Sequence, residues 1–318
     1  MKLSFETIKN ITVGSLNTRE QNGIARFSKY SDAMLSAWGG KSAALGKNAA
    51  ATTGVRLDFH TNSQRIAFKT LTAGKHEIKV DGLSRALVTA EEGEEVSFDL
   101  RAPLGEKQEE YRVTLVLPSH DRNGAVEYLE LDDGADVRPH SFDRKFLFIG
   151  DSITQGWAST FDSFSYAYRV SEFFNAESVI QGVGGAYFHE DCFEDSGFDP
   201  EMVFVSYGTN DFGHYKTLED LGLHVDAFME KLAEAYGDKK IFVISPIWRV
   251  KRDGKAMGSF ADCRRVIIET AEKYGFEHID GLTLVPPMEC LLADGLHPND
   301  LGFSFYSENL IKYLVNKI

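Results

Sequence analysis

The pattern of apolar residues changes near residue 140 of this 318-residue chain. Before that point, short segments alternate apolar and polar residues, which is typical of strands with one buried face. After it, segments rich in Phe, Ile and Val alternate with amphipathic stretches, which indicates parallel strands covered by helices on both faces. Because the chain is longer than one core usually serves, we predict a β-sandwich domain over residues 1–140 and an α/β domain over residues 141–318.

Strand-like segments with a two-residue period recur through the first half, at 55–60, 76–80, 95–100 and 111–117. The pair Asp81-Gly82 follows the second of these and favours a tight hairpin turn. An antiparallel sandwich is therefore expected. The stretch 37–54, "AWGGKSAALGKNAAATTG", favours neither helix nor strand, and we expect a long loop that crosses the sandwich.

In the second half, five buried strands are predicted, at 145–150, 177–183, 202–208, 240–245 and 276–280. Two long helices are predicted between them. One runs from Thr217 to Gly237 and the other from Ser259 to Gly275, because each begins at a hydroxyl that caps a helix and ends at glycine. In such sheets, ligands bind beyond the carboxyl ends of the strands.

Residues suited to acyl transfer follow several of these strands. Ser152 lies just after the first strand, and Asn210 lies just after the third. Gly184 and Gly185 follow the second strand, where bare backbone N–H groups can approach a ligand. Near the C-terminus, Asp294 and His297 are three residues apart, which allows the carboxylate to hold the imidazole. Together they supply a hydroxyl, a base with its carboxylate, and donors for an oxyanion.

Four short blocks, taken in order, resemble the SGNH (GDSL-type) hydrolase family. They are "GDSIT" at 150–154, "QGVGG" at 181–185, "GTND" at 208–211 and "DGLHP" at 294–298. The resemblance implies a flavodoxin-like three-layer α/β/α domain that works without a cofactor or metal. The preceding half is similar to the jelly-roll-like modules of some members, including carbohydrate acetyl esterases and an acyltransferase-like group.

Carried over position by position, the resemblance implies Ser152 as nucleophile, His297 as general base and Asp294 as its orienting partner. The oxyanion hole then consists of the backbone N–H of Ser152, a glycine N–H and the side chain of Asn210. We favour Gly185 for the glycine because of its distance from the strand, with Gly184 as the alternative. Such an enzyme passes through an acyl-enzyme on Ser152.

Substrate class is less constrained by the residues. Aromatic side chains are expected at the rim, where they can line a sugar or an acyl chain, and our predicted substrate-binding set is Asp151, Trp157, Gly184, Tyr187 and Trp248. We predict a serine esterase that removes a short acyl group, with acetyl preferred, from a carbohydrate or another polar alcohol. An acyltransferase using the same site and a non-catalytic carbohydrate-binding protein are the alternatives.

Other chemistries fit the sequence less well. In "GVGGAY", Tyr187 occupies the last glycine position of a dinucleotide-binding fingerprint. "HEDC" at 189–192 has metal-capable side chains but no partner pair at ligand spacing, so we expect a surface loop there rather than a zinc site. His214, just after "GTND", is the rival to His297 as general base.

The net charge and the cysteine content limit which binding partners and which cellular compartment we expect for this protein. The formal net charge is −14, most of it after residue 140, and this argues against nucleic acid or an anionic membrane as partner. Three widely spaced cysteines, Cys192, Cys263 and Cys290, fit a reducing compartment. The segment "MKLSFETIKNITVGSL" lacks the apolar run of a signal peptide. We therefore expect a cytoplasmic protein that acts on a small-molecule ester; its oligomeric state is not predicted.

Overall fold

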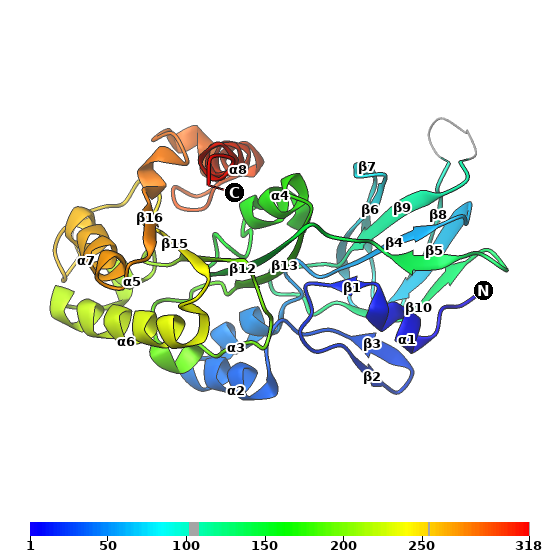
Figure 1. Cartoon of the computed structure of the whole chain (residues 1–318), viewed down its shortest axis with the longest axis horizontal. Helices are drawn as coiled ribbons and strands as arrows, with labels where there is room; N and C mark the ends of the chain where they lie inside the picture. The colour runs from blue at the N-terminus through cyan, green and yellow to red at the C-terminus, as the bar shows by residue number, and fades with distance from the viewer. Residues whose placement is uncertain (102–107, 254, 318) are drawn as a thin grey trace.

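The computed structural model describes residues 1–101, 108–253 and 255–317, and its first half is a sandwich of two antiparallel sheets (Figure 1). One sheet has the order β1-β4-β9-β6-β7, with β11 paired to β4; its strands are Thr12–Val13, Arg56–Thr61, Tyr111–Val116, Gly74–Val80, Leu83–Ala90 and Val137–Pro139. The other has the order β2-β3-β10-β5-β8, with strands Arg19–Gln21, Ile24–Arg26, Ala125–Leu131, Arg65–Thr70 and Glu95–Asp99. The short helix α1 (Phe5–Asn10) precedes them.

Among the described residues the sandwich encloses one core, but β4, β6 and β9 do not show the expected alternation: they are buried along most of their length, and polar residues such as Arg56, Asp58 and Glu77 are buried as well. Buried side chains from both sheets meet there, among them Leu57, Phe59, Ile66, Phe68, Val113, Leu115 and Leu129. The hairpin between β6 and β7 turns at Asp81 and Gly82, whose φ angles of 52° and 77° are those of a tight primed turn. The predicted sandwich and its hairpin are therefore confirmed.

The stretch expected to be a loop is helical, so that prediction was wrong. Residues Asp32–Lys41 form α2 and Ala43–Ala50 form α3. Each helix begins at a serine: the Oγ of Ser31 accepts a hydrogen bond from Met34 N–H, and that of Ser42 accepts one from Leu45 N–H. Buried side chains recur at helical spacing, at Met34, Trp38, Leu45 and Ala49. The Gly and Ala content concealed this pattern, because such small residues weaken the contrast between the two faces of a helix.

In the described residues of the second half, five parallel strands lie in the order β13-β12-β14-β15-β16. Their bounds are Ala176–Gly182, Arg144–Gly150, Met202–Ser206, Lys240–Ile244 and Glu277–Ile279. Numbered along the chain, this is the flavodoxin-like order 2-1-3-4-5. The predicted three-layer α/β/α domain is confirmed, because helices cover both faces of the sheet.

The two faces are covered by different sets of helices (Figure 1). On one face lie α4 (Tyr166–Phe173) and α8 (Asp300–Leu314). The other carries α6 (Leu218–Tyr236) and α7 (Phe260–Lys273), together with α2 and α3 from the N-terminal half. The oxygens of Thr217 and Ser259 cap α6 and α7, as predicted.

The helices α2 and α3 replace a missing crossover helix. Residues 183–201, all of them described, connect β13 to β14 and contain only the short 3₁₀ turn η2 (Glu190–Cys192). Trp38 and Leu45 pack in the same cluster as Leu147 and Val179 of the parallel sheet. A segment from the N-terminal half thus completes a layer of the α/β domain. The domain boundary near residue 140 stays a prediction.

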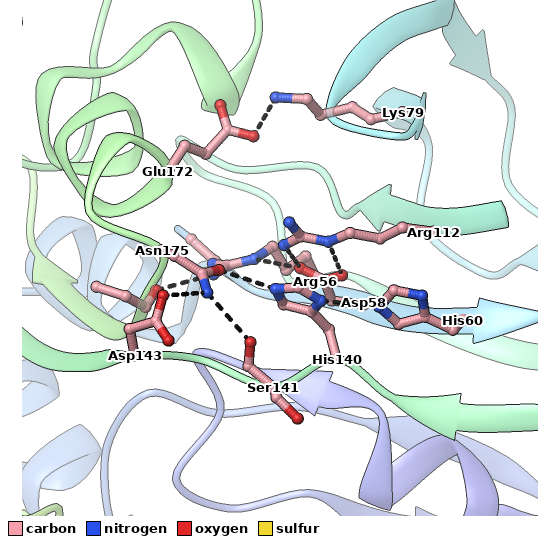
Figure 2. Close-up of polar contacts among 12 residues, drawn as sticks. Arg56, Asp58, His60, Lys79, Arg112, His140, Ser141, Asp143, Glu172 and Asn175 are labelled. Atoms are coloured by element: carbon pink, nitrogen blue, oxygen red, sulfur yellow. Dashed lines mark hydrogen bonds and ion pairs between the residues drawn. The ribbon is translucent and has the colours of Figure 1, made fainter.

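A polar cluster joins the sandwich to the α/β domain (Figure 2). Both oxygens of the Asp58 carboxylate accept hydrogen bonds from Arg112, at 2.9 and 2.8 Å, and Arg56 lies 3.5 Å from the same carboxylate. His140 lies 2.8 Å from the Asn175 side-chain oxygen.

Among the described residues, no helix combines the length and apolar character needed to span a bilayer.

Candidate active site

The nucleophile candidate lies where β12 ends and the chain turns sharply. A Cβ at Gly150 would lie 2.1 Å from Thr154 Oγ1 and 2.6 Å from Ser206 O, so only glycine fits the last position of the strand. The turn is held by backbone bonds from Gln155 N–H to Asp151 O and from Trp157 N–H to Ser152 O. Ser152 is thereby fixed at the carboxyl edge of the parallel sheet.

The side chains of Ser152, His297 and Asp294 are joined in series by hydrogen bonds at this edge. The Oγ of Ser152 lies 2.8 Å from Nε2 of His297, and Nδ1 of His297 lies 2.8 Å from Oδ2 of Asp294. A carboxylate only accepts, so Nδ1 carries the proton and Nε2 is free to accept from the serine hydroxyl. The structure therefore brings together the three residues predicted to act as nucleophile, base and orienting acid.

Asp294 is held by the loop as well as by the imidazole. Its Oδ1 accepts hydrogen bonds from the backbone N–H groups of Leu296 and His297, at 3.0 and 2.9 Å. Partial burial works to raise its pKa, but the hydrogen bonds from His297 outweigh burial and lower the pKa below its ordinary value. The lowered pKa keeps the Asp294 carboxylate ionised, so that it can accept the hydrogen bond from His297 Nδ1, although 54% of the Asp294 side chain is exposed.

The three predicted oxyanion donors each keep a hydrogen that is free to bind a ligand. In the described part of the chain, the backbone N–H groups of Ser152 and Gly185 have no acceptor. The N–H of Gly184, by contrast, donates to Oε1 of Gln155 at 2.6 Å. Gly185 also has a φ of +85°, which favours glycine. Of the two adjacent glycines, the structure leaves Gly185 free to bind an oxyanion.

Asn210 follows β14 and immediately precedes the short helix α5 (Asp211–His214). Its side-chain Nδ2 donates one hydrogen bond to Ala186 O at 2.8 Å, which orients the amide and leaves its second hydrogen free. This contact links Asn210 to the loop that carries Gly185. The assignment of Asn210 to the oxyanion hole stays a prediction.

Asp151 lies beneath the site and is 2% exposed. Its Oδ1 accepts a hydrogen bond from Ile153 N–H at 2.8 Å. Burial raises the pKa of Asp151 to about 7; the nearby carboxylate of Asp211 also raises it, while the hydrogen bond from Ile153 opposes the shift. Burial likewise raises the pKa of Asp211 to about 7. Asp151 thus holds the nucleophile turn through Ile153 N–H and, being buried, does not present its carboxylate at an open rim as the predicted substrate-binding role requires.

The predicted aromatic residues have different surroundings. Trp157 is 37% exposed, and its ring centre lies 6.5 Å from that of His297. Tyr187 stacks on His214 with 3.7 Å between the ring centres. Trp248 instead lines a surface cavity of about 420 Å³ with residues such as Arg252, Phe260 and Leu282. The lining of that cavity includes none of the residues in the serine–histidine–aspartate chain.

Several residues that position the site were missed from the sequence. Asn48 Nδ2 of α3 donates to Gly184 O at 2.8 Å, and Gln155 Nε2 donates to Asn48 O at 3.2 Å. Lys29 Nζ donates to Gly182 O at 2.6 Å, and burial lowers the pKa of this lysine to about 7 against the attraction of Asp162. No local pattern signals these contacts, because the lysine is separated from its acceptor by 153 residues.

A five-stranded sheet of flavodoxin-like order that carries a serine–histidine–aspartate chain at its carboxyl edge defines a serine-hydrolase type of domain. Residues 148–304 match the model of the GDSL-like Lipase/Acylhydrolase family. This part of the chain therefore belongs to the GDSL-like lipase/acylhydrolase family, and its resemblance to SGNH hydrolases is confirmed. No curated protein matches the sequence significantly.

Solved structures share the arrangement of both halves. The salicylyl-acyltransferase SsfX3 from a tetracycline biosynthetic pathway superposes with a TM-score of 0.82 at 18% identity, covering 96% of this chain and 94% of that one. A family two carbohydrate esterase from Cellvibrio japonicus gives 0.71 at 14% identity, covering 99% and 97%. The acetyl xylan esterase Est2A from the rumen bacterium Butyrivibrio proteoclasticus gives 0.62 at 17% identity, covering 83% and 89%. At these identities the likeness shows the fold.

Proposed function

We propose that this protein is a serine esterase that hydrolyses short-chain acyl esters, with acetyl preferred, on a carbohydrate or another polar alcohol. The observation that supports this most directly is the position of Ser152. Its hydroxyl lies 2.8 Å from an imidazole nitrogen that can accept its proton. Beside it are N–H donors without acceptors in the described part of the chain. Esterolysis requires this combination of base and oxyanion donors.

In the acylation step, Nε2 of His297 takes the proton of Ser152 as Oγ attacks the ester carbonyl carbon. The carbonyl electron pair moves to oxygen, and the oxyanion accepts hydrogen bonds from Ser152 N–H, Gly185 N–H and Asn210 Nδ2. His297 then gives its proton to the alcohol oxygen as the carbon–oxygen bond breaks. The alcohol leaves, and the acyl group stays on Ser152.

Deacylation uses the same groups in the reverse roles. His297 takes a proton from a water molecule that attacks the acyl carbon, and the same donors hold the second oxyanion. When the bond to Oγ breaks, His297 returns the proton to Ser152 and the carboxylic acid departs. Asp294 holds the imidazole tautomer throughout and stabilises the imidazolium.

The surroundings of His297 support a polar alcohol with an apolar face. Trp157 exposes part of its indole beside His297, and an exposed ring of this kind can stack on a sugar. The names of two structural neighbours, a family two carbohydrate esterase and an acetyl xylan esterase, agree with an acetylated carbohydrate.

Transfer of the acyl group to a second alcohol is the alternative reaction. It is favoured by the likeness to a salicylyl-acyltransferase, which extends over 96% of this chain. The two reactions separate by product analysis with and without added sugars or alcohols. An ester product that forms faster than free acid would make the protein a transferase.

A non-catalytic carbohydrate-binding protein is the third candidate. A binding protein has no need of the hydrogen bonds that join Ser152, His297 and Asp294 or of the free N–H groups. For this reason we rank this candidate last. Sugar binding measured by calorimetry that survives Ser152→Ala, in a protein without esterase activity, would establish it.

The decisive experiment measures hydrolysis of p-nitrophenyl esters of increasing acyl length. We expect activity that is highest on acetyl and falls with chain length, and a loss of about 10⁶-fold in Ser152→Ala, the scale on which a serine nucleophile contributes. The control is Ser84→Ala, which alters an exposed serine of β7 in the sandwich. Activity that survives in Ser152→Ala would reject the proposed nucleophile. Mass spectrometry after treatment with a fluorophosphonate should find the adduct on Ser152.

A further inference from the structure

Three side chains that can ligate a metal converge outside the proposed active site. His189 and Glu190 lie at η2, in the connection between β13 and β14, and His224 lies on α6. One possible ligand atom from each lies within 4.8 Å of the other two. The sequence analysis set aside a zinc site at "HEDC" because no partner pair stood at ligand spacing. The fold supplies the partner from a helix 34 residues downstream of Glu190.

The distances among these atoms are close to those of a metal site. Oε2 of Glu190 lies 2.8 Å from Nδ1 of His224 and 3.8 Å from Nδ1 of His189. In a tetrahedral zinc site with bonds of about 2.0–2.1 Å, neighbouring ligand atoms are about 3.3 Å apart. The two measured distances fall on either side of that value, and all three ligand atoms lie within 4.8 Å of one another. To bind the ion, Nδ1 of His189 gives up the hydrogen bond that it accepts from Asp191 N–H at 3.2 Å.

The chemistry of the donors selects the ion. Two imidazole nitrogens with one carboxylate suit Zn²⁺ and related first-row divalent ions, whereas Mg²⁺ and Ca²⁺ prefer all-oxygen sites. All three side chains are partly buried, which reduces competition from water. Oδ2 of Asp191 lies 3.8 Å from Nδ1 of His189 and can supply a fourth ligand in place of water.

Neighbouring aromatic rings restrict the two histidines. Tyr215 stacks on His224 with 5.1 Å between ring centres, and Tyr187 packs edge-on against His189 at 6.1 Å. Rings held in this way lose less freedom on binding an ion than solvated side chains do. Together these observations distinguish the cluster from a chance group of surface acids.

One nearby cation opposes metal binding. Nζ of Lys41, at the end of α2, lies 2.8 Å from Nε2 of His189 and 3.2 Å from Oδ2 of Asp191. An imidazole that ligates through Nδ1 carries its proton on Nε2 and no longer accepts from this ammonium. Lys41 then retains only its ion pair with Asp191. The positive charge of Lys41 weakens metal binding at the site. A variant without this charge should therefore bind the ion more tightly, whereas variants that lack a ligand should bind it less tightly.

We propose that His189, Glu190 and His224 bind one Zn²⁺ or a related first-row divalent ion. The ion fastens η2 to α6, next to the loop that carries Tyr187 and Gly185. This site is separate from the proposed esterase chemistry and does not depend on it.

The test is calorimetric titration of ZnCl₂ into tag-free protein freed of metal with a chelator. We expect one ion per chain in the wild type and no comparable binding of MgCl₂. Removing a ligand, in His224→Ala or Glu190→Gln, should weaken affinity by about 100-fold or more, since even outer-sphere partners account for 10–100-fold. Lys41→Gln should bind more tightly than the wild type. The matched control is His214→Ala, which removes a neighbouring imidazole that is not a ligand.

Two results would overturn the proposal. One is a wild type that binds zinc no better than His224→Ala, and the other is an equal loss of affinity in His214→Ala. Circular dichroism of the metal-free variants checks that each is folded. A measurement on the wild type alone removes any dependence on the variants: bound Co²⁺ should show the visible bands of a four-coordinate nitrogen and oxygen site. The pale spectrum of hexaaqua Co²⁺ would contradict it.

Discussion

Asp58 and Asp151 are buried to almost the same degree, at 1% and 2% exposure, yet their carboxyl groups behave in opposite ways. Burial works to raise the pKa of both. At Asp58, hydrogen bonds and charge from Arg112 and Arg56 outweigh burial, and the pKa falls below its ordinary value. At Asp151, burial prevails and raises the pKa to about 7. The difference comes from what surrounds each carboxylate.

The surroundings of each aspartate are typical of the region in which it lies. In the cluster between the domains, charges face opposite charges, as Arg112 faces Asp58 and Lys79 faces Glu172 (Figure 2). At the carboxyl edge of the parallel sheet, Asp151 forms no ion pair within the described residues, and donors beside Ser152 lack acceptors. Paired groups hold the fold together. Donors without partners are available to a ligand.

The largest effect is expected from breaking the paired cluster. Asp58→Ala leaves Arg56 and Arg112 without their carboxylate, and removal of one partner from a buried pair costs about 3–5 kcal/mol. Denaturant unfolding should show this loss of free energy of unfolding. Asp133→Ala serves as control, because its side chain is 98% exposed and should change stability by no more than about 0.5 kcal/mol. A loss below about 1 kcal/mol in Asp58→Ala would mean that the cluster is not a stabilising network.

The next effect concerns the unpaired donors and should appear in catalysis rather than in stability. Asn210→Ala removes one proposed oxyanion donor, and kcat should fall by about 10²–10³ while KM changes little. Steady-state kinetics on the acetyl ester measures this. Asn316→Ala, at an exposed position near the C-terminus, should leave kcat unchanged. A much smaller fall in kcat for Asn210→Ala would remove this side chain from the oxyanion hole.

The smallest effect follows from the raised pKa of Asp151. A carboxyl group whose pKa is about 7 in the folded state and 3.8 in the unfolded state binds its proton more tightly when folded. Its stabilising contribution is complete below the unfolded pKa and is lost as pH rises through the folded pKa. Asp151→Asn keeps an oxygen acceptor for Ile153 N–H and removes this titration. Between pH 5 and 8 it should therefore gain on the order of 2 kcal/mol in free energy of unfolding relative to wild type.

Paired unfolding curves at several pH values check this prediction. Asp133→Asn, an exposed aspartate, should follow the wild type at every pH. If the difference between Asp151→Asn and wild type stays constant with pH, Asp151 does not titrate in this range and the contrast with Asp58 fails.

Local sequence patterns correctly located the strands that they predicted. The two-residue period located β4, β6, β8 and β9, and the apolar runs located all five parallel strands. The wrong prediction is the loop at 37–54, because the end of α2 and the whole of α3 lie within it. Small residues on the exposed side weakened the amphipathic signal there, and the apolar stripe became recognisable only with the parallel sheet beneath it.

The site residues also divide into those that the sequence indicated and those that only the structure revealed. The motifs indicated Ser152, His297 and Asp294, which the structure joins by hydrogen bonds; Ser152 directly follows a strand, and the other two lie in one short loop. The choice between adjacent glycines needed the contact from Gln155 to Gly184. Trp248, expected at the rim, lines a surface cavity whose lining includes none of Ser152, His297 and Asp294.

By itself, the sequence determined several strands of each half, the caps of two long helices, the two kinds of sheet and the motifs that end the parallel strands. These depend on residues close together along the chain, whose periodicity and capping are local properties. Only the tertiary structure decided that α3 braces the glycine loop through Asn48 and Gly184, 136 residues apart, and that His224 meets Glu190. Contacts of this kind arise when packed layers bring distant segments together, and no local pattern records which segments those are.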